Sequence, residues 1–327
     1  MKIVAFEVRE DEQIYFEQMK QKYNETTLAL FPQKLSEETI GLCEGAMGVS
    51  VLGFSLINKV LIDKLVKMGI KYISTRTIGY DHIDVEYAKT HGLIVCNSSY
   101  PPNGVAEYTV MLMLMTLRHY KPALYRGQVN NFSLGGLQGR ELNDLTVGIL
   151  GTGKIGSTVI QILSGFGCKI LAYDPYPNPL LDEKVTYVEI EDIYREADVI
   201  SLHVPYFKEN YHLINDEEIS KMKKGVTIIN AARGELISVQ ALIRGIESEQ
   251  IGALGLDTVE HEKGLVHIDH KVDILQNRDI AYLRQFPNVV MTPHMAFYTN
   301  TATRSMVETS INGIMDLIHT GETKNIV

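Results

Sequence analysis

The sequence predicts an α/β protein of two domains, each built on a doubly wound parallel sheet. Short apolar runs rich in Val and Ile alternate with helix-compatible segments along most of the chain, which is the pattern of parallel strands covered by helices. Residues 145–174 join two such runs through a glycine-rich turn. The length of 327 residues exceeds what one hydrophobic core usually holds and favours two domains.

Composition excludes several classes of partner. With 31 Lys and Arg against 40 Asp and Glu, the net charge is −9, and no basic tract offers a nucleic-acid surface. No apolar run reaches the roughly 20 residues that cross a bilayer, and residues 1–8 fit a strand better than a signal peptide. The three cysteines, Cys43, Cys96 and Cys168, are far apart, which favours free thiols in a reducing compartment. We therefore expect a soluble, cytoplasmic protein without nucleic-acid or membrane partners.

The first hundred residues predict one α/β domain. We expect strands at 3–8, 26–31, 47–52, 72–77 and 93–97, with helices at 12–23, 58–68 and 85–91 and a short helix opened by Ser36 and Glu38. Pro101 and Pro102 interrupt this alternation, so residues 98–102 are expected to cross between domains. Asn103 is placed to cap a helix running to about residue 118. Because that helix is apolar on all sides, we expect it to be buried at a domain junction or a subunit interface.

The glycine-rich segment predicts a dinucleotide site. A strand at 146–150 leads into Gly151, Gly153 and Gly156, followed by a helix at about 154–165 and a strand at 169–173. Gly151 permits a tight turn, Gly153 lets the backbone approach a pyrophosphate, and Gly156 allows helix and strand to pack closely. The N–H groups at the start of the helix favour phosphate.

The acid that ends the second run selects the cofactor. Asp174 lies about 20 residues beyond the glycines, where a carboxylate hydrogen-bonds a ribose 2′-hydroxyl. Its charge would repel a 2′-phosphate, and Pro175, Tyr176 and Pro177 supply no arginine to hold one. NAD is therefore favoured over NADP.

The remaining apolar runs complete a second domain. They lie at 198–204, 226–231, 253–259 and 288–292, with helices at 216–223 and 240–250 between them. Together with the two runs around the glycines they make six strands, the number in a full doubly wound dinucleotide domain. A last helix at 301–319 has no strand behind it, so we expect it to return to the first domain. The predicted domains are residues 1–100 with 299–327, and residues 101–298.

Ligands of parallel sheets bind at the carboxyl ends of the strands, and polar side chains follow these ends. They are Asn97, His203 with Val204 and Pro205, Arg233, Asp257 and His294. An arginine, a histidine and acids at neighbouring strand ends indicate a catalytic site.

These motifs resemble the D-2-hydroxyacid dehydrogenases, most of all their D-lactate and D-2-hydroxyisocaproate branch, over essentially the full length. The matching segments are 147–156, 202–205, 229–234, 255–257 with Glu260 and Glu262, and 288–298, joined by 9–12, 77–84 and 100–107. The resemblance implies a Rossmann NAD-binding domain inserted into a discontinuous, flavodoxin-like substrate domain. It also implies a homodimer formed through the NAD-binding domain.

The resemblance assigns His294 as general acid/base, Glu262 as its carboxylate partner and Arg233 as the substrate anchor. The chemistry agrees, because the planar fork of arginine grips a carboxylate and imidazole has a pKa of about 6.5, close to working pH. A neighbouring carboxylate would raise that pKa. From the residues alone, Glu260 and Glu262 both flank His261 and either could face the site. Asp257 is expected to tune the site or to orient the amide end of the nicotinamide.

The full expected site follows from these roles. The cofactor residues are Gly151, Gly153, Lys154, Ile155, Gly156, Asp174, Val204, Pro205, Ala231, Arg233, Asp257 and His294, and the substrate residues are Ile78, Gly79, Tyr80, Tyr100, Arg233 and Tyr298. Tyr80 departs from the smaller residue of the family, which leaves substrate size open, and Pro101 departs from its Ser. His261, His267 and His270 fit no short ligand motif, so no metal is expected.

The predicted activity is NAD-dependent, stereospecific reduction of a small 2-oxo acid, with pyruvate to D-lactate ranked first. A branched substrate, as for a D-2-hydroxyisocaproate dehydrogenase, is one alternative. The other is a non-enzymatic NAD-sensing protein, because proteins of this fold also act as transcriptional co-repressors.

Overall fold

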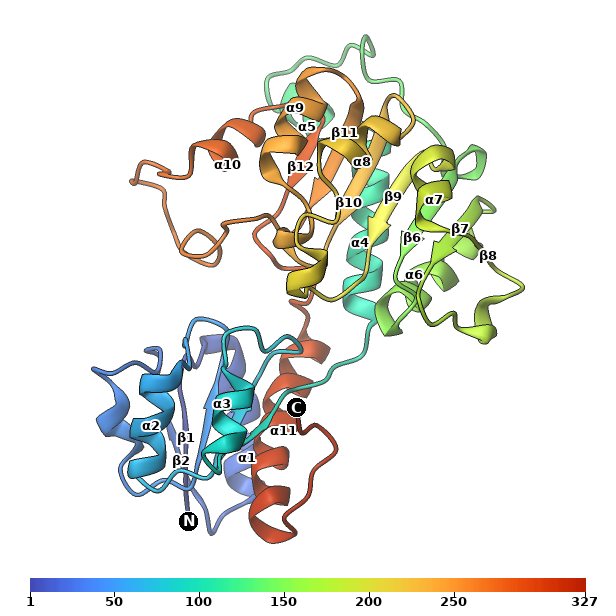
Figure 1. The fold of residues 1–327 in the computed structure, drawn as a ribbon. Helices are drawn as coiled ribbons and strands as arrows, with labels where there is room; N and C mark the ends of the chain where they lie inside the picture. The colour runs from blue at the N-terminus through green and yellow to red at the C-terminus, as the bar shows by residue number, and fades with distance from the viewer. The chain divides into compact units, whose positions relative to one another are not determined.

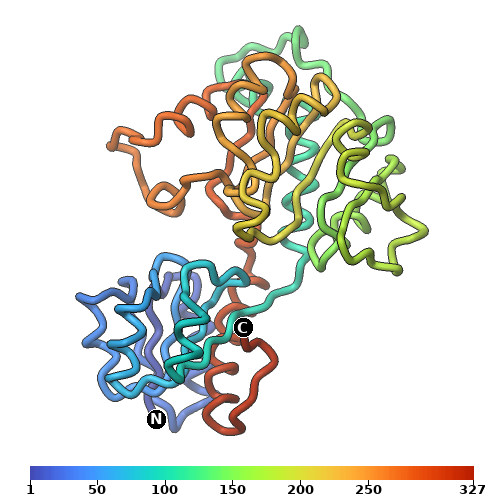
Figure 2. Tube along the Cα trace, viewed as in Figure 1, coloured from blue at the N-terminus to red at the C-terminus, as the bar shows by residue number.

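A computed structural model describes all residues from Met1 to Val327. The chain forms two compact units, one made of Met1–Pro101 with Tyr298–Val327 and the other of Pro102–Phe297 (Figure 1). The first unit is discontinuous, and the blue N-terminal and red C-terminal segments lie together in it (Figure 2).

The sheet of the first unit has five parallel strands in the order β2-β1-β3-β4-β5. They are β1 (Lys2–Ala5), β2 (Thr27–Leu30), β3 (Gly48–Val51), β4 (Tyr72–Thr75) and β5 (Ile94–Cys96), with the helices α1 (Gln13–Lys22), α2 (Lys59–Lys67), α3 (Val85–Thr90) and α11 (Asn300–His319). This strand order is the flavodoxin-like one, which confirms the predicted fold.

Helices cover both faces of this sheet because successive side chains of a strand point to opposite sides. Ile3 packs into a cluster with residues of α1 and α11, such as Phe16 and Ile311. Its neighbour Val4 packs on the other face with residues of α2, such as Leu61. The last helix of the chain thus supplies part of the core of the first unit.

Two local predictions in this region are wrong. Ser36 opens a turn rather than an α-helix, since its amide donates to the hydroxyl of Thr39 over 2.9 Å, and only a 3₁₀ turn at Ile40–Cys43 follows. Asn103 does not cap α4 (Asn103–Leu117), because it is already the first helical residue. Pro102 precedes it with a φ of −71°, which suits the start of a helix.

The sheet of the second unit has seven parallel strands in the order β12-β11-β10-β9-β6-β7-β8. They are β6 (Thr146–Leu150), β7 (Lys169–Tyr173), β8 (Thr186–Tyr187), β9 (Val199–Leu202), β10 (Val226–Asn230), β11 (Ile251–Leu256) and β12 (Val289–Met291). Counted from β6, the order is 3-2-1-4-5-6 with one added edge strand, as in Rossmann folds. The sequence predicted six strands and missed β8, because two residues show no periodicity.

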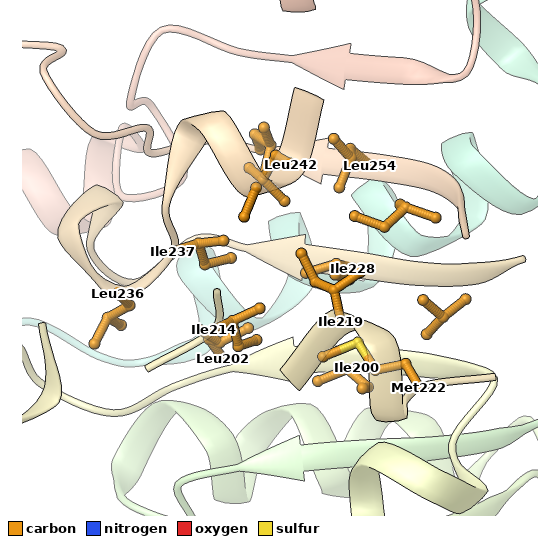
Figure 3. Close-up of a cluster of buried hydrophobic side chains, with 14 of the residues drawn as sticks. Ile200, Leu202, Ile214, Ile219, Met222, Ile228, Leu236, Ile237, Leu242 and Leu254 are labelled. Carbon is orange, nitrogen blue, oxygen red and sulfur yellow. The ribbon is translucent and has the colours of Figure 1, made fainter. Parts of the chain in front are cut away.

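Helices also cover both faces of this sheet. They are α4, α5 (Tyr120–Gln128), α6 (Lys154–Ser164), α7 (Ile190–Glu196), α8 (Asp216–Lys221), α9 (Val239–Glu247) and α10 (Arg278–Leu283). α4 packs against α6 and against β10, β11 and β12, so this apolar helix is largely buried inside the second unit, and its place at a domain junction or a subunit interface stays a prediction. On the opposite face, Ile200, Ile228 and Leu254 of the sheet meet Ile219 of α8 and Leu242 of α9 (Figure 3). None of the helices combines the length and the apolar character needed to cross a bilayer.

Candidate active site

Six parallel strands of the second unit have their carboxyl ends side by side. The paired last residues are Tyr173 with Leu150, Leu150 with Leu202, Leu202 with Asn230, Asn230 with Leu256, and Leu256 with Met291. Six loops therefore leave the same edge of the sheet. They carry the glycines, Asp174, Pro205, Arg233, Asp257 and His294, so most of the residues predicted from sequence for this unit come together.

The three glycines of the first loop are required for different reasons. Gly151 has a φ of 95°, and a Cβ there would lie 2.8 Å from the carbonyl oxygen of His203. A Cβ at Gly156 would lie 2.0 Å from the carbonyl oxygen of Gly151. At Gly153, which precedes α6, a Cβ would meet no protein atom within 4 Å. The fold thus requires two of the glycines, and the third leaves open space at a helix N-terminus, where a pyrophosphate fits.

Asp174 is fixed beside this loop. Its carboxylate accepts hydrogen bonds from the backbone amide of Thr152 over 2.7 Å, from the Thr152 hydroxyl over 3.1 Å and from the amide of Tyr176 over 2.9 Å. Thr152 was not predicted from the sequence, where its only signal was its place between two of the glycines. A fixed carboxylate suits a ribose diol and disfavours a 2′-phosphate.

The other predicted cofactor residues surround the same loop. Lys154 and Ile155 begin α6. Val204 follows β9, and its Cγ1 atom would lie 2.9 Å from a Cβ at Gly151. Pro205 comes next, and Ala231 directly follows β10. This edge therefore has the glycine turn, the helix N-terminus and the acid that an NAD molecule requires.

Arg233 is held by a buried side chain at the end of β10. Asn230 donates through Nδ2 to the carbonyl oxygen of Arg233 over 2.8 Å, and its Oδ1 accepts from the amide of Ala232 over 3.0 Å. A Cβ at Gly234 would lie 2.2 Å from the carbonyl carbon of Val259, so the loop packs tightly on the backbone after β11. Asn230 was also missed, although a polar residue that ends a buried strand was visible in the sequence.

Asp257 holds the loop that carries the histidine. It is 1% exposed, and its carboxylate accepts from the hydroxyl of Thr292 over 2.6 Å and from the amides of Met295 and Ala296 over 2.9 and 2.8 Å. Both carboxylate oxygens are therefore used within the protein. This arrangement is that of a residue that positions the loop.

His294 and Glu262 form a direct pair. Nδ1 of His294 lies 2.5 Å from Oε1 of Glu262, and Oε2 of Glu262 accepts from the amide of Val259 over 3.0 Å. The His294 side chain is 32% exposed and that of Glu262 is 20% exposed. Because Nδ1 is engaged by the carboxylate, Nε2 is the nitrogen that can serve a ligand.

Glu260 has different partners. Its Oε1 accepts from the Tyr211 hydroxyl over 2.6 Å and lies 2.8 Å from Nε2 of His212. The side chain is 5% exposed. Of the two glutamates that the sequence left open, Glu262 is the one that contacts His294.

The surroundings of His294 favour its charged form. Burial alone lowers its pKa, but the hydrogen bond and charge of Glu262, together with the charge of Asp257, outweigh burial. Arg233 opposes them. The net effect raises the pKa of His294 above its ordinary value, so the imidazolium persists closer to neutral pH.

The predicted substrate residues of the first unit follow β4 and β5. Asn97 donates to the carbonyl oxygen of Ile78 over 2.8 Å, and the Thr77 hydroxyl donates to that of Gly79 over 2.5 Å. Tyr80 is 42% exposed, and Tyr100 is half-buried. These hydrogen bonds shape a loop whose side chains are accessible.

Tyr298 belongs to the same unit. Its ring is 47% exposed and lies 5.4 Å from the guanidinium carbon of Arg9. Arg9 in turn donates through Nε to Asp11 over 2.9 Å. Arg9 begins one of the matching motifs, but no role of its own was predicted for it.

A buried ion pair underlies this edge of the first unit. Nε of Arg76 lies 2.8 Å from Oε1 of Glu12, and both residues are 0% exposed. Arg76 also donates to Ser50 Oγ over 2.9 Å and to the carbonyl oxygen of Phe6 over 2.8 Å. This pair was not predicted from the sequence, because its members are 64 positions apart.

The three loop histidines are not gathered into one site. His261 has a side chain that is 68% exposed, and His270 lies 3.5 Å from Asp273. His267 contacts the backbone of His294. The structure contains no group of three or more His, Cys, Asp or Glu side chains placed to hold a metal ion.

Comparisons with known proteins identify the family. Residues 110–296 match the family model of the D-isomer specific 2-hydroxyacid dehydrogenase NAD binding domain. The chain is 43% identical to an aromatic 2-oxoacid reductase of Clostridium sporogenes, over 99% of this chain and 98% of the relative. It is 37% identical to a D-lactate dehydrogenase of Lactiplantibacillus plantarum, over 98% of each.

A solved structure of a D-2-hydroxyisocaproate dehydrogenase superposes with a TM-score of 0.90 at 34% identity, covering 100% of this chain and 99% of the other. The fold agrees with this family, and so do the glycine turn, the helix N-terminus and the acid at the carboxyl end of the second sheet. The chain belongs to the D-isomer-specific 2-hydroxyacid dehydrogenases and is an NAD-dependent enzyme of that family.

Proposed function

We propose that this enzyme reduces a 2-oxo acid to the D-2-hydroxy acid, with His294 as the general acid. The hydrogen bond between Glu262 and His294 carries the proposal, because it orients the imidazole and favours its protonated form. NADH, when bound, supplies the hydride.

Each residue has a defined task in this reaction. Arg233 binds the substrate carboxylate through its guanidinium fork. As negative charge develops on the carbonyl oxygen, His294 donates the proton on Nε2, and Glu262 stabilises the imidazolium throughout. In the reverse direction, the neutral imidazole takes the hydroxyl proton. General acid catalysis of this kind contributes about 10²–10⁴-fold.

The two units divide the binding of ligands. The second unit binds NAD through its glycine loop, Asp174 and the loops after β9 and β10. The first unit acts as the substrate domain, and the sequence motifs assign its loop carrying Ile78 and Gly79 to the substrate carboxylate. The same motifs assign Tyr80, Tyr100 and Tyr298 to the substrate side chain.

Two kinds of substrate are candidates. Pyruvate is the substrate that the sequence motifs favour, with branched 2-oxo acids such as 2-oxoisocaproate as its alternative. Aromatic 2-oxo acids are a second candidate, because the chain is 43% identical to an aromatic 2-oxoacid reductase and 37% identical to a D-lactate dehydrogenase. The aromatic candidate requires more room for the substrate side chain than pyruvate does.

An NADH oxidation assay tests the function and ranks the substrates. Pyruvate, 2-oxoisocaproate and phenylpyruvate are compared by kcat/KM, with chiral analysis of the products. Turnover that yields the D-isomer is expected. Absence of turnover with every 2-oxo acid would overturn the proposal.

His294→Ala tests the assigned role in the same assay. Turnover should fall by about 10²–10⁴-fold while NADH still binds. Equal loss of NADH binding would instead make His294 a structural residue.

We also propose that the enzyme is a cytoplasmic homodimer formed through the NAD-binding unit. α5 has no buried residue, and Leu124 and Tyr125 on it are 50% and 67% exposed. Phe132 and Leu134 beyond it are 79% and 84% exposed. Several exposed large apolar side chains in one segment are typical of a protein interface. The three free cysteines fit a reducing compartment, and cell fractionation tests that location.

A further inference from the structure

His267 donates a hydrogen bond to the main chain of His294. Nε2 of His267 lies 3.0 Å from the carbonyl oxygen of His294. Because a carbonyl oxygen only accepts, the proton must be on Nε2 of His267. The contact thus reaches the backbone of the proposed general acid from the loop between β11 and α10.

The backbone of His294 needs such support. His294 has a φ of 53°, a left-handed conformation that non-glycine residues adopt only where the surroundings enforce it. On the amino side, its amide donates to the carbonyl oxygen of Asp257 over 2.9 Å. On the carboxyl side, the next two amides donate to the Asp257 carboxylate. The carbonyl oxygen of His294 accepts from His267, so the main-chain polar groups on both sides of this residue are bound.

Glu262 and His267 lie in one short turn. The amides of Leu265 and Val266 donate to the carbonyl oxygen of Glu262 over 2.9 and 3.2 Å, which folds the segment back on itself. Glu262 binds the imidazole of His294, and His267 binds its backbone. The same segment therefore controls both the ring and the main chain of one residue.

An aromatic side chain completes the arrangement. The ring of Phe297 lies edge-on to the imidazole of His267 at 6.2 Å and to that of His294 at 6.5 Å. Edge-to-face contacts of this length favour particular ring orientations. The two imidazoles themselves are 6.2 Å apart and tilted, so they do not share a proton directly.

We propose that His267 is a positioning residue for catalysis, which acts by holding the left-handed turn at His294. This proposal rests on the proposed role of His294 as general acid. Without the hydrogen bond from His267, the carbonyl loses its partner and the turn relaxes. The Nε2 atom of His294 then departs from the substrate oxygen during part of each turnover. Proton transfer slows, whereas the glycine loop and Asp174 are not displaced, so that NADH binding is unchanged.

The experiment compares four variants with the native enzyme. In His267→Ala the donor is lost, and in His267→Gln the side-chain amide keeps a donor near the position of Nε2. His270→Ala is the matched control, a histidine of the same loop that pairs with Asp273. His294→Ala is measured in parallel. Steady-state kcat, KM for NADH and the solvent deuterium isotope effect on kcat are determined, with the thermal unfolding midpoint as a check of folding.

His267→Ala should lower kcat by about 3- to 10-fold, the range of one ordinary hydrogen bond, and leave KM for NADH unchanged. The solvent isotope effect should rise, and His267→Gln should restore most of kcat, while His270→Ala behaves as native. A native kcat in His267→Ala, or a loss that glutamine does not restore, would overturn this inference. If His294→Ala itself keeps its turnover, the proposed general acid is wrong, which is a separate result.

Discussion

The backbone amide of His294 donates to the main-chain carbonyl of Asp257 over 2.9 Å, and the carboxylate of this aspartate accepts from the next two amides. The main chain and the buried side chain of Asp257 thus both hold the turn at His294. Asparagine at position 257 would present an NH₂ group to one of these amides.

We expect Asp257→Asn to lower kcat by more than 10-fold, since an unsatisfied buried amide costs about 1–3 kcal/mol and the turn moves to relieve it. The thermal midpoint should fall as well. Asp182→Asn, on the exposed surface, is the control and should behave as native. Unchanged turnover in Asp257→Asn would show that the turn is held by other contacts.

The raised pKa of His294 predicts opposite pH dependence for the two directions. Reduction requires the imidazolium, so its kcat/KM is high below the pKa of His294 and falls as pH rises through it. Oxidation requires the neutral imidazole and rises through the same pKa. Because Glu262 raises this pKa, Glu262→Gln should move both limbs to lower pH.

Profiles of kcat/KM against pH in both directions measure this shift. Glu260→Gln is the matched control, because Glu260 contacts Tyr211 and His212 instead of His294, and its limbs should stay in place. A shift in Glu260→Gln but not in Glu262→Gln would reverse the assignment of the two glutamates.

Two substitutions in the glycine loop should affect folding and NADH binding separately. Gly156→Ala should strongly destabilise the protein, because the new Cβ would lie 2.0 Å from a carbonyl oxygen. Gly153→Ala should keep a near-native thermal midpoint, since its Cβ enters open space. NADH should nevertheless bind more than 10-fold more weakly, because the new methyl group occupies the space expected for the pyrophosphate. Native NADH affinity in Gly153→Ala would place the cofactor elsewhere.

Asp174 should determine the preference for NADH over NADPH. Asp174→Ala removes the charge and also the bonds to Thr152, so the ratio of kcat/KM for NADH to that for NADPH should fall. Asp174→Asn keeps an acceptor for Thr152 but loses the charge, and separates the two effects. If both variants keep the native ratio, the carboxylate does not select the cofactor.

The exposed apolar side chains of α5 should hold the proposed dimer together. Leu124→Glu with Tyr125→Glu places two charges in this apolar surface, and light scattering should then report a monomer. Val272→Glu is the matched control, because Val272 is 97% exposed in a different loop and should leave the dimer intact. A double variant that stays dimeric would locate the interface on another surface.

Periodicity predicted most of the strands, and glycine spacing predicted which of them adjoin the dinucleotide loop. The runs at 146–150 and 169–173 became β6 and β7 without change. Shorter elements escaped, such as β8 with two residues and α10 with six, because so few residues show neither a period of two nor one of 3.6. Asn103 was misplaced as a cap because the geometry of the preceding proline already begins the helix.

Some of the proposed site residues could likewise be predicted from the sequence, and others could not. Arg233 and His294 were predictable because each follows an apolar strand, and parallel strands bring their carboxyl ends to one edge. Asn230 and Thr152 were missed, since their roles depend on hydrogen bonds to loops whose conformation the sequence does not display.

The sequence alone determined the fold class and the glycine motif of the dinucleotide domain, because these depend on local patterns, and its family resemblance predicted the reacting side chains. Only the tertiary structure decided that Glu262 rather than Glu260 pairs with His294, and that Asp257 and His267 hold its turn. These choices depend on distances of a few ångströms between loops that follow different strands. Residue order does not encode such distances, because packing of the whole sheet edge sets them.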